Sequence, residues 1–236
     1  MNESRSSRPG LAMRLGAELA IIVVGVLLAL WADAWVGARA DRRIEHNRVE
    51  ALRDNVVASR GRLESASEEA QAAYDALAEI AYWQDPARVS EREDLVLQGF
   101  LFGPVFTPEV NVYADLKSSG DLALLTNVDL RQALARMDAT FEQLDLLQAD
   151  LTMVQQLNFD PFVVREFALG ATMGPYLGLE DLPADAPSPD VDPRILRNLA
   201  LFKLDLVEQL MAKYADAADA LDAVEAAMRE DEQAGR

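Results

Sequence analysis

Residues Leu19–Ala32 read LAIIVVGVLLALWA and contain no charged side chain. With their flanks they form segment 17–36, and a helix of that length, at about 1.5 Å per residue, spans roughly the 30 Å hydrocarbon core of a bilayer. Trp31 and Trp35 stand at its far end, where aromatic rings prefer the membrane interface. The pattern predicts a single transmembrane helix that follows a short basic tail, residues 1–16.

Two other interpretations of this segment stay open. The core helix of a soluble protein is also apolar, although an uncharged stretch bounded by Arg and interfacial Trp is typical of membranes. A cleaved signal peptide is the second, because Arg5, Arg8 and Arg14 form a basic start and Ala32-Asp33-Ala34 resembles a small-residue cleavage site. The aromatic residues after the apolar stretch favour a retained helix.

Three further residues give the predicted anchor its details. Glu18 precedes the apolar stretch, at the end of the helix where the dipole favours a negative charge. Gly25 and Ala29 are small residues four positions apart, a spacing that permits close contact with another membrane helix. The anchor residues of interest are therefore Glu18, Gly25, Ala29, Trp31 and Trp35.

The charges beside the segment give conflicting signals about orientation. A bare count of Arg is higher after the segment, which would place the following domain in the cytoplasm. Those Arg alternate with acidic residues such as Asp41 and Glu45, whereas the N-terminal flank has a net positive charge before Glu18. We therefore expect the N-terminus inside and the domain outside the cytoplasm.

The soluble part is acidic, since the formal net charge of the 236 residues is −18 and the first 36 residues are balanced. Such a surface repels nucleic-acid phosphates, so no nucleic-acid partner is expected. The chain has no cysteine, which excludes disulfides, thiolate catalysis and cysteine metal sites. Half of the residues are hydrophobic, as in an ordinary folded domain.

Helical periodicity dominates everything after residue 36. Apolar residues recur in alternating steps of three and four, the pattern of a heptad seam, and Asp85-Pro86 is expected to end this stalk helix, residues 37–85. The seam positions are Val49, Leu52, Val56, Ser59, Leu63, Ala66, Ala70, Ala73, Leu77 and Ile80.

Residues 86–182 are predicted to form the core of a helical bundle. A capping box at Ser90 and Glu93 begins one short helix, and Asp160-Pro161 is expected to cap and begin another. The glycines after residue 169 are expected to break the helical pattern. A long helix between them has the apolar stripe Leu130, Leu134, Met137, Phe141, Leu144, Leu147, Leu151 and Val154.

A linker rich in Pro and Asp, residues 183–193, separates this core from a C-terminal helix, residues 194–232, which Asp192-Pro193 begins. The predicted fold class is all-α, with one N-terminal transmembrane helix that continues into a bundle of long amphipathic helices. The apolar stripe predicted for the last helix is Ile195, Leu199, Phe202, Leu206, Leu210, Tyr214, Ala217, Leu221, Val224 and Met228.

The segment from Tyr113 to Leu134 has the most specific local pattern. It predicts a short helix over Asn111–Lys117, a left-handed cap at Gly120, and a long helix capped by Thr126 or Asn127. A well-packed corner and a ligand site are both consistent with it. Its candidate residues are Tyr113, Leu116, Ser118, Ser119, Gly120, Asn127 and Arg131.

The same segment and the anchor also carry a resemblance. Gly16, Glu18, Leu19, Gly25, Ala29, Leu30 and Trp35, together with Leu-x-Ser-Ser-Gly-x-Leu and Asn-x-x-Leu-Arg in the corner, resemble a family of uncharacterised bacterial single-span membrane proteins. The resemblance implies an anchored architecture in the bacterial inner membrane and supplies no activity. With the orientation above, it implies a periplasmic domain.

Catalytic chemistry is sparse. His46 is the only histidine, and we expect it to be a solvated surface residue. No catalytic residue, cofactor or metal site is predicted. The expected function is therefore non-enzymatic: a membrane-tethered interaction or accessory protein that binds protein partners, a second copy or subunits of a membrane complex.

Two alternatives stay open. One is a sensor or ligand-binding domain with a pocket lined by Phe100, Phe102, Phe106 or Phe167. The other is an enzyme built from paired carboxylates.

Overall fold

The computed structural model of the chain describes residues 10–83, 93–101, 103–167, 169–179 and 191–234. Every regular element in these ranges is a helix, which confirms the all-α class. The predicted features at Asp85-Pro86 and Ser90, the side chain of Glu93 and most of the Pro/Asp-rich linker lie outside the described residues. The structure divides into two compact units, residues 1–50 and 51–236.

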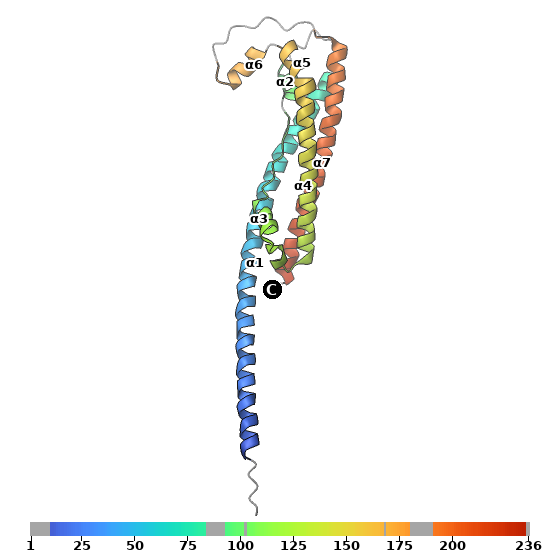
Figure 1. The fold of residues 1–236 in the computed structure, drawn as a ribbon. Helices are drawn as coiled ribbons and strands as arrows, with labels where there is room; N and C mark the ends of the chain where they lie inside the picture. The colour runs from blue at the N-terminus through green and yellow to red at the C-terminus, as the bar shows by residue number, and fades with distance from the viewer. Residues whose placement is uncertain (1–9, 84–92, 102, 168, 180–190, 235–236) are drawn as a thin grey trace, which may run out of the picture. The chain divides into compact units, whose positions relative to one another are not determined.

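The first part is helical from Gly10 onward, as the beginning of α1 (Gly10–Ala81; Figure 1). From Ile22 to Val36 its large apolar side chains are exposed, with fractions such as 66% for Trp31. An apolar window near the start of this helix is long and hydrophobic enough, by length and composition, to cross a membrane. Among the residues that the structure describes, this is the one candidate membrane helix, and it lies at the predicted place.

The stalk seam is confirmed, because every predicted position from Val49 to Ile80 is buried, including the polar Ser59. Several small Ala side chains in its middle let neighbouring elements approach closely. After residue 50, α1 is tied to other parts of the bundle. The side chain of Arg60 forms ion pairs with Asp222 and, at 3.0 Å, with Glu225.

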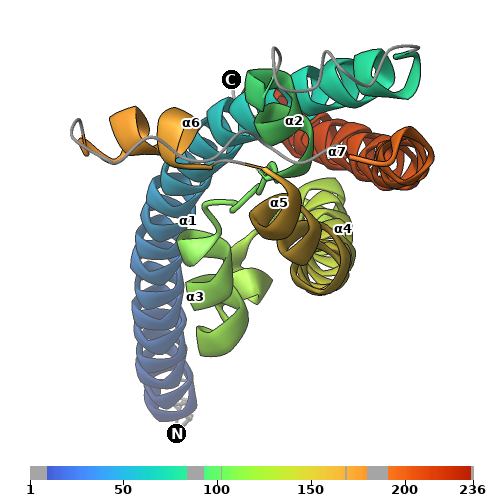
Figure 2. The same cartoon turned by 90° about the horizontal axis from the view of Figure 1, so that it is seen from above.

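The remaining elements follow the predicted order, and α4 and α7 lie side by side in both views (Figure 1 and Figure 2). Asn127 begins α4 because its side chain accepts a hydrogen bond from the backbone N–H of Leu130, while Asp192 Oδ1 accepts one from Arg194 N at the start of α7. The elements are α2 (Glu93–Phe100), α3 (Asn111–Ser119), the 3₁₀ turn η2 (Asp121–Leu124), α4 (Val128–Val154), the π-turn η3 (Gln155–Phe159), α5 (Asp160–Glu166), α6 (Leu169–Tyr176) and α7 (Pro193–Ala234).

A helix, α5, begins at Asp160 with Pro161 in its first turn, as predicted, but the predicted capping role of Asp160 is wrong. The chain passes from α4 through η3 into α5, and Phe159, Asp160 and Gln155 all keep right-handed helical backbone angles. Pro161 lies in the first turn of α5, directly after η3. Asp160 therefore does not cap a separate helix, and its carboxylate instead accepts a hydrogen bond from Gln155 Nε2.

The predicted break at the glycines is wrong in part, since Gly170 and Gly174 lie inside α6. The turn comes later, at Gly178, whose φ of +71° is a left-handed conformation that favours glycine. Two turns of helix are short enough to tolerate the lower helix propensity of the glycines.

The predicted stripes are shifted at the ends of α4 and α7 that face the π-turn. In α7 the side chains of Ile195 and Phe202 are exposed, and in α4 Leu147 and Val154 are only half-buried. The heptad steps of three and four continue through polar residues, which a count of apolar positions passes over. The buried positions missed are Gln148, Leu196, Ala200, Lys203 and Val207.

Candidate functional site

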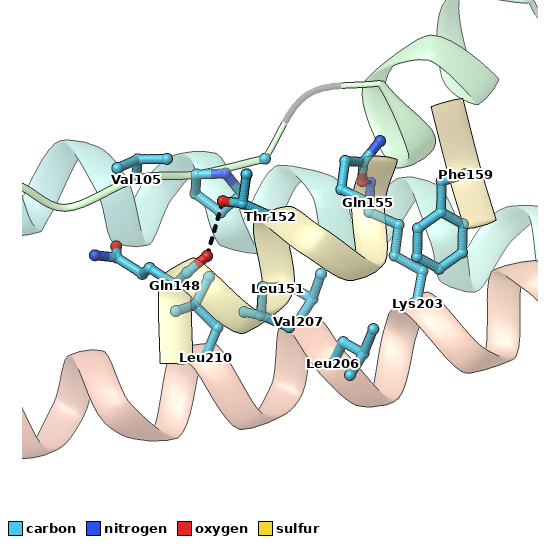
Figure 3. Close-up of a pocket in the computed structure, with 12 residues that line it drawn as sticks. Val105, Gln148, Leu151, Thr152, Gln155, Phe159, Lys203, Leu206, Val207 and Leu210 are labelled. Atoms are coloured by element: carbon cyan, nitrogen blue, oxygen red, sulfur yellow. Dashed lines mark hydrogen bonds between the residues drawn. The ribbon is translucent and has the colours of Figure 1, made fainter. Parts of the chain in front are cut away.

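A cavity of about 230 Å³ lies between the end of α4, η3, the loop 103–105 and the first half of α7 (Figure 3). Most of its lining is apolar, and exposed lining residues such as Val105 and Thr152 mark its opening. We call it the Lys203 cavity. Its described lining residues are Gly103, Pro104, Val105, Gln148, Leu151, Thr152, Gln155, Phe159, Lys203, Leu206, Val207 and Leu210.

Lys203 is buried, with 5% of its surface exposed. Its Nζ donates hydrogen bonds to the backbone oxygen of Phe100 at 2.6 Å and to Oε1 of Gln155 at 2.7 Å. It also lies 5.1 Å from the centre of the Phe159 ring, within the range of a cation–π contact. Burial lowers the pKa of Lys203 to about 7, although the charge of Asp160 acts in the opposite direction.

The amide of Gln155 connects this ammonium to the nearest charge. Its oxygen accepts from Lys203, and its nitrogen donates to Asp160 Oδ1 and, at 2.6 Å, to the backbone oxygen of Phe100. The π-turn positions Gln155 and Phe159 on either side of Lys203 (Figure 3). π-turns are rare and occur frequently at functional sites, so this π-turn favours a functional role for the residues around Lys203.

Gln148 closes the other end of the cavity. Its amide accepts from Phe106 N at 2.7 Å and donates to Phe106 O at 3.0 Å, so it satisfies both backbone groups of one buried residue. The hydroxyl of Tyr214 lies 3.3 Å from Gln148 Oε1 and 3.2 Å from the oxygen of Pro104, and its burial raises the Tyr214 pKa. Thr152 Oγ1 donates to the backbone oxygen of Gln148 at 2.8 Å (Figure 3).

The arrangement gives an apolar space with one positive group at one end. Of the described lining residues, Lys203 is the only titratable one. Among the described residues, the hydrogen-bond partners of Lys203 are both neutral oxygens. The chemistry offered is therefore the binding of a small molecule with an apolar body and a group that accepts hydrogen bonds from an ammonium.

The Ser-Ser-Gly corner is a separate region, and none of its candidate residues lines the Lys203 cavity. Gly120 has a φ of +82° and ends α3. The hydroxyls of Ser118 and Ser119 donate to the backbone oxygens of Asp115 and Leu116, and Tyr113 and Leu116 are buried. These contacts account for the corner's sequence pattern by local folding.

The second half of the corner is joined to α7. Asn127 Nδ2 donates to the backbone oxygen of Ala227 at 3.1 Å, while its Oδ1 caps α4. Arg131 donates to the backbone oxygen of Leu125. The motif thus connects α3, α4 and α7 at one end of the bundle.

The anchor residues lie in the first part of α1. Trp31 and Trp35 are exposed, Ala29 is exposed, and a Cβ atom at Gly25 would meet no atom within 4 Å. The guanidinium of Arg39 lies 5.7 Å from the Trp35 ring centre. Glu18 belongs to α1, and its side chain lies outside the described part. His46 is exposed, as predicted.

The predicted pocket of aromatic side chains is misplaced. Phe100, Phe106 and Phe167 are buried in ring-to-ring packing, such as the 5.4 Å contact between Phe106 and Phe141, and they do not line the cavity. Phe102 lies outside the described residues. Sequence reasoning also missed Lys203, although the seam Leu210, Tyr214, Ala217, Leu221 leads back in steps of three and four to Val207 and then to Lys203.

Comparison of the chain with protein-family models, with curated proteins and with solved structures found no match in any of the three. The resemblance of the anchor and corner to single-span bacterial proteins therefore stays a prediction.

Proposed function

We propose that this chain is a membrane-anchored, non-enzymatic binding protein of the bacterial inner membrane, whose acidic helical domain holds a small ligand in the Lys203 cavity. The single observation that carries the proposal is a buried ammonium in the wall of an otherwise apolar cavity. Burying an ammonium without an opposite charge costs stability. A binding role accounts for this cost, because a ligand would form a hydrogen bond with the ammonium.

The anchor in this proposal is supported by exposure. The large apolar side chains from Ile22 to Val36 are exposed. A contiguous apolar surface of this extent is typical of a segment that contacts lipid or a partner. The spacing of Trp31 and Trp35 after it is typical of the lipid interface.

Alkaline extraction of membranes from cells that express the full chain tests the anchor. A Leu27→Arg substitution puts a charge near the middle of the segment, at a cost of about 2.5–3.5 kcal/mol for insertion. We expect this variant to shift toward the soluble fraction. Val57→Arg is the matched control, because Val57 is also an exposed apolar residue of α1. Extraction of the wild-type chain at alkaline pH would contradict the proposal.

The proposed periplasmic location rests on the positive N-terminal flank. Protease added to spheroplasts with intact inner membranes should remove the domain after residue 36. Survival of the domain until the membranes are lysed would place it in the cytoplasm and reject this part of the proposal.

Ligand binding is tested with the full chain in lipid nanodiscs. A set of small apolar molecules, neutral and anionic, is screened for a rise in the unfolding temperature, since a ligand that binds only the native state stabilises it. Leu206→Phe is the control variant, because the larger ring reduces the cavity that Leu206 lines. We expect at least one compound to stabilise the wild type but not this variant. No stabilisation by any compound would reject the binding role.

Protein partners, including a second copy of the chain, are the second candidate. The observation in their favour is the open surface at Gly25 and Ala29, where another helix could approach closely. Crosslinking in intact membranes should then capture a neighbour, and Gly25→Leu should reduce that product. Absence of any crosslinked protein would argue against this candidate.

A further inference from the structure

We propose that the ligand of the Lys203 cavity is a small monocarboxylate with a short apolar body, whose carboxylate bonds to Nζ of Lys203. This inference rests on the proposed function, since it names the ligand class of the same cavity. It is carried by three features of the site: the neutral surroundings of the ammonium, the apolar wall and the size of the space.

The hydrogen bonds of Lys203 leave room for an anion. An ammonium has three donor hydrogens, and the oxygens of Phe100 and Gln155 use two of them. Among the described residues no carboxylate lies within salt-bridge distance of Nζ. The carboxylate of Asp160 is connected to Nζ only through the amide of Gln155. A carboxylate from outside can therefore supply both the third acceptor and the opposite charge, in a charge-assisted bond stronger than those to neutral oxygens.

The wall beyond the ammonium favours an apolar body. Leu206, Val207 and Leu210 from α7, Leu151 from α4 and Pro104 from the loop 103–105 all line the cavity. The oxygen of the Gln148 amide already accepts from Phe106 N and lies 3.3 Å from the hydroxyl of Tyr214, so it offers little to a further donor. A dicarboxylate or a sugar would leave polar groups without partners in this part of the cavity, which is costly.

The size of the cavity sets the size of the ligand. A cavity of about 150 Å³ takes up benzene, which has six carbon atoms. By proportion, the volume of about 230 Å³ accommodates about nine non-hydrogen atoms. Benzoate and hexanoate are molecules of this size, whereas a long-chain fatty acid would extend beyond the cavity.

A covalent role for Lys203 is less well supported. A lysine in an apolar pocket can attack a carbonyl to form an imine, with loss of water. That reaction needs proton transfers by a second group, and the described lining holds no other titratable side chain. Non-covalent binding of a carboxylate requires no such group.

The binding should depend on pH. A carboxylate ligand needs the charged form of Lys203, whose pKa in the empty cavity is about 7. The charged group that acts on Lys203 is Asp160 on α5, while the described lining from α4, η3, α7 and the loop 103–105 is otherwise neutral. The dissociation constant should therefore rise about tenfold per pH unit above this value, as the charged fraction falls.

Calorimetric titration of the full chain in phosphatidylcholine nanodiscs tests the inference, with empty nanodiscs as the blank. The probes are benzoate and its neutral analogue benzyl alcohol, at pH 6.5 and pH 8.5. We expect benzoate to bind more tightly than benzyl alcohol, and Lys203→Met to weaken benzoate by roughly ten- to a hundredfold. Lys213→Met is the matched control, because Lys213 lies on the same helix and pairs with Asp216 outside the cavity.

A second variant keeps the test decisive if Lys203→Met perturbs the fold. Gln155→Glu retains Lys203 but gives it a carboxylate of the protein's own, so benzoate should bind more weakly. Equal binding of benzoate and benzyl alcohol, unchanged by either substitution, would overturn the carboxylate inference while leaving the binding role intact. No binding of either probe, with no stabilisation by any screened compound, would reject both.

Discussion

Nζ of Lys203 in α7 lies 2.7 Å from Oε1 of Gln155 in the π-turn. The two residues are 48 positions apart in the chain, and both are polar residues at positions that continue the buried stripes of α4 and α7. The contact places the bundle's one deeply buried described ammonium against a neutral oxygen, with no carboxylate in direct contact. Burial without a carboxylate in direct contact lowers the pKa of Lys203, and this makes the stability of the domain depend on pH.

Stability should rise from pH 7 to pH 9 because of Lys203. Its pKa is about 7 in the folded protein and 10.5 when solvated, so in this window the unfolded chain binds the extra proton and the folded chain does not. Two pH units correspond to roughly 2–3 kcal/mol of added stability. Denaturation by urea, followed by circular dichroism, measures the change.

Lys203→Met is the comparison that isolates this group, since other groups titrate in both proteins. We expect the variant to lack the extra rise in stability between pH 7 and pH 9. Parallel pH profiles for the two proteins would show that Lys203 is not the source.

Gln148→Leu should destabilise the domain by about 2–4 kcal/mol. The substitution leaves the buried N–H and C=O of Phe106 without their partner, and each unsatisfied group costs about 1–3 kcal/mol. Thermal unfolding measures the loss. Gln132→Leu, at an exposed position of the same helix, is the control and should change stability by less than about 0.5 kcal/mol.

Gly120→Ala and Gly61→Ala should have opposite effects. Gly120 has a φ of +82°, where a side chain costs about 1–2 kcal/mol, although a Cβ would meet no atom within 4 Å. Gly61 lies inside α1 with open space around it, so alanine should add about 0.5–1 kcal/mol through helix propensity. A shift of both melting temperatures in the same direction would contradict this assignment.

Two substitutions at Asn127 separate its two contacts. Asn127→Ala removes both the cap of α4 and the bond to the oxygen of Ala227, and should cost about 1–2 kcal/mol. Asn127→Asp keeps the capping oxygen and loses only the donor to Ala227, so it should cost less. Equal losses in chemical denaturation would show that the bond to α7, rather than the cap, accounts for the effect.

The sequence predicts the helical class, the seam of α1 and the caps at Gly120, Asn127 and Asp192, because these features depend on spacing and on local backbone bonding. The apolar pattern of the sequence does not predict the cavity. Lys203 lies at a seam position, but a polar residue there is indistinguishable from an exposed one until the partner helix is known.

The π-turn is the second feature that local reasoning misses. Asp160-Pro161 is a strong signal for a helix start, and nothing nearby in the sequence indicates that the preceding helix continues into it. The deciding contacts come from distant segments, such as the 5.8 Å packing of the Phe159 ring on Phe100.

The π-turn at Gln155–Phe159 also limits how this region can change in length. A π-turn holds one residue more than a regular α-helical turn, and each residue of an α-helix turns its neighbour by about 100°. A single-residue deletion here would rotate the side chains of α5, including the buried Phe162 and Val163, away from their present packing. Chains that share this cavity should therefore vary by substitution in this stretch, while insertions and deletions are confined to the loops.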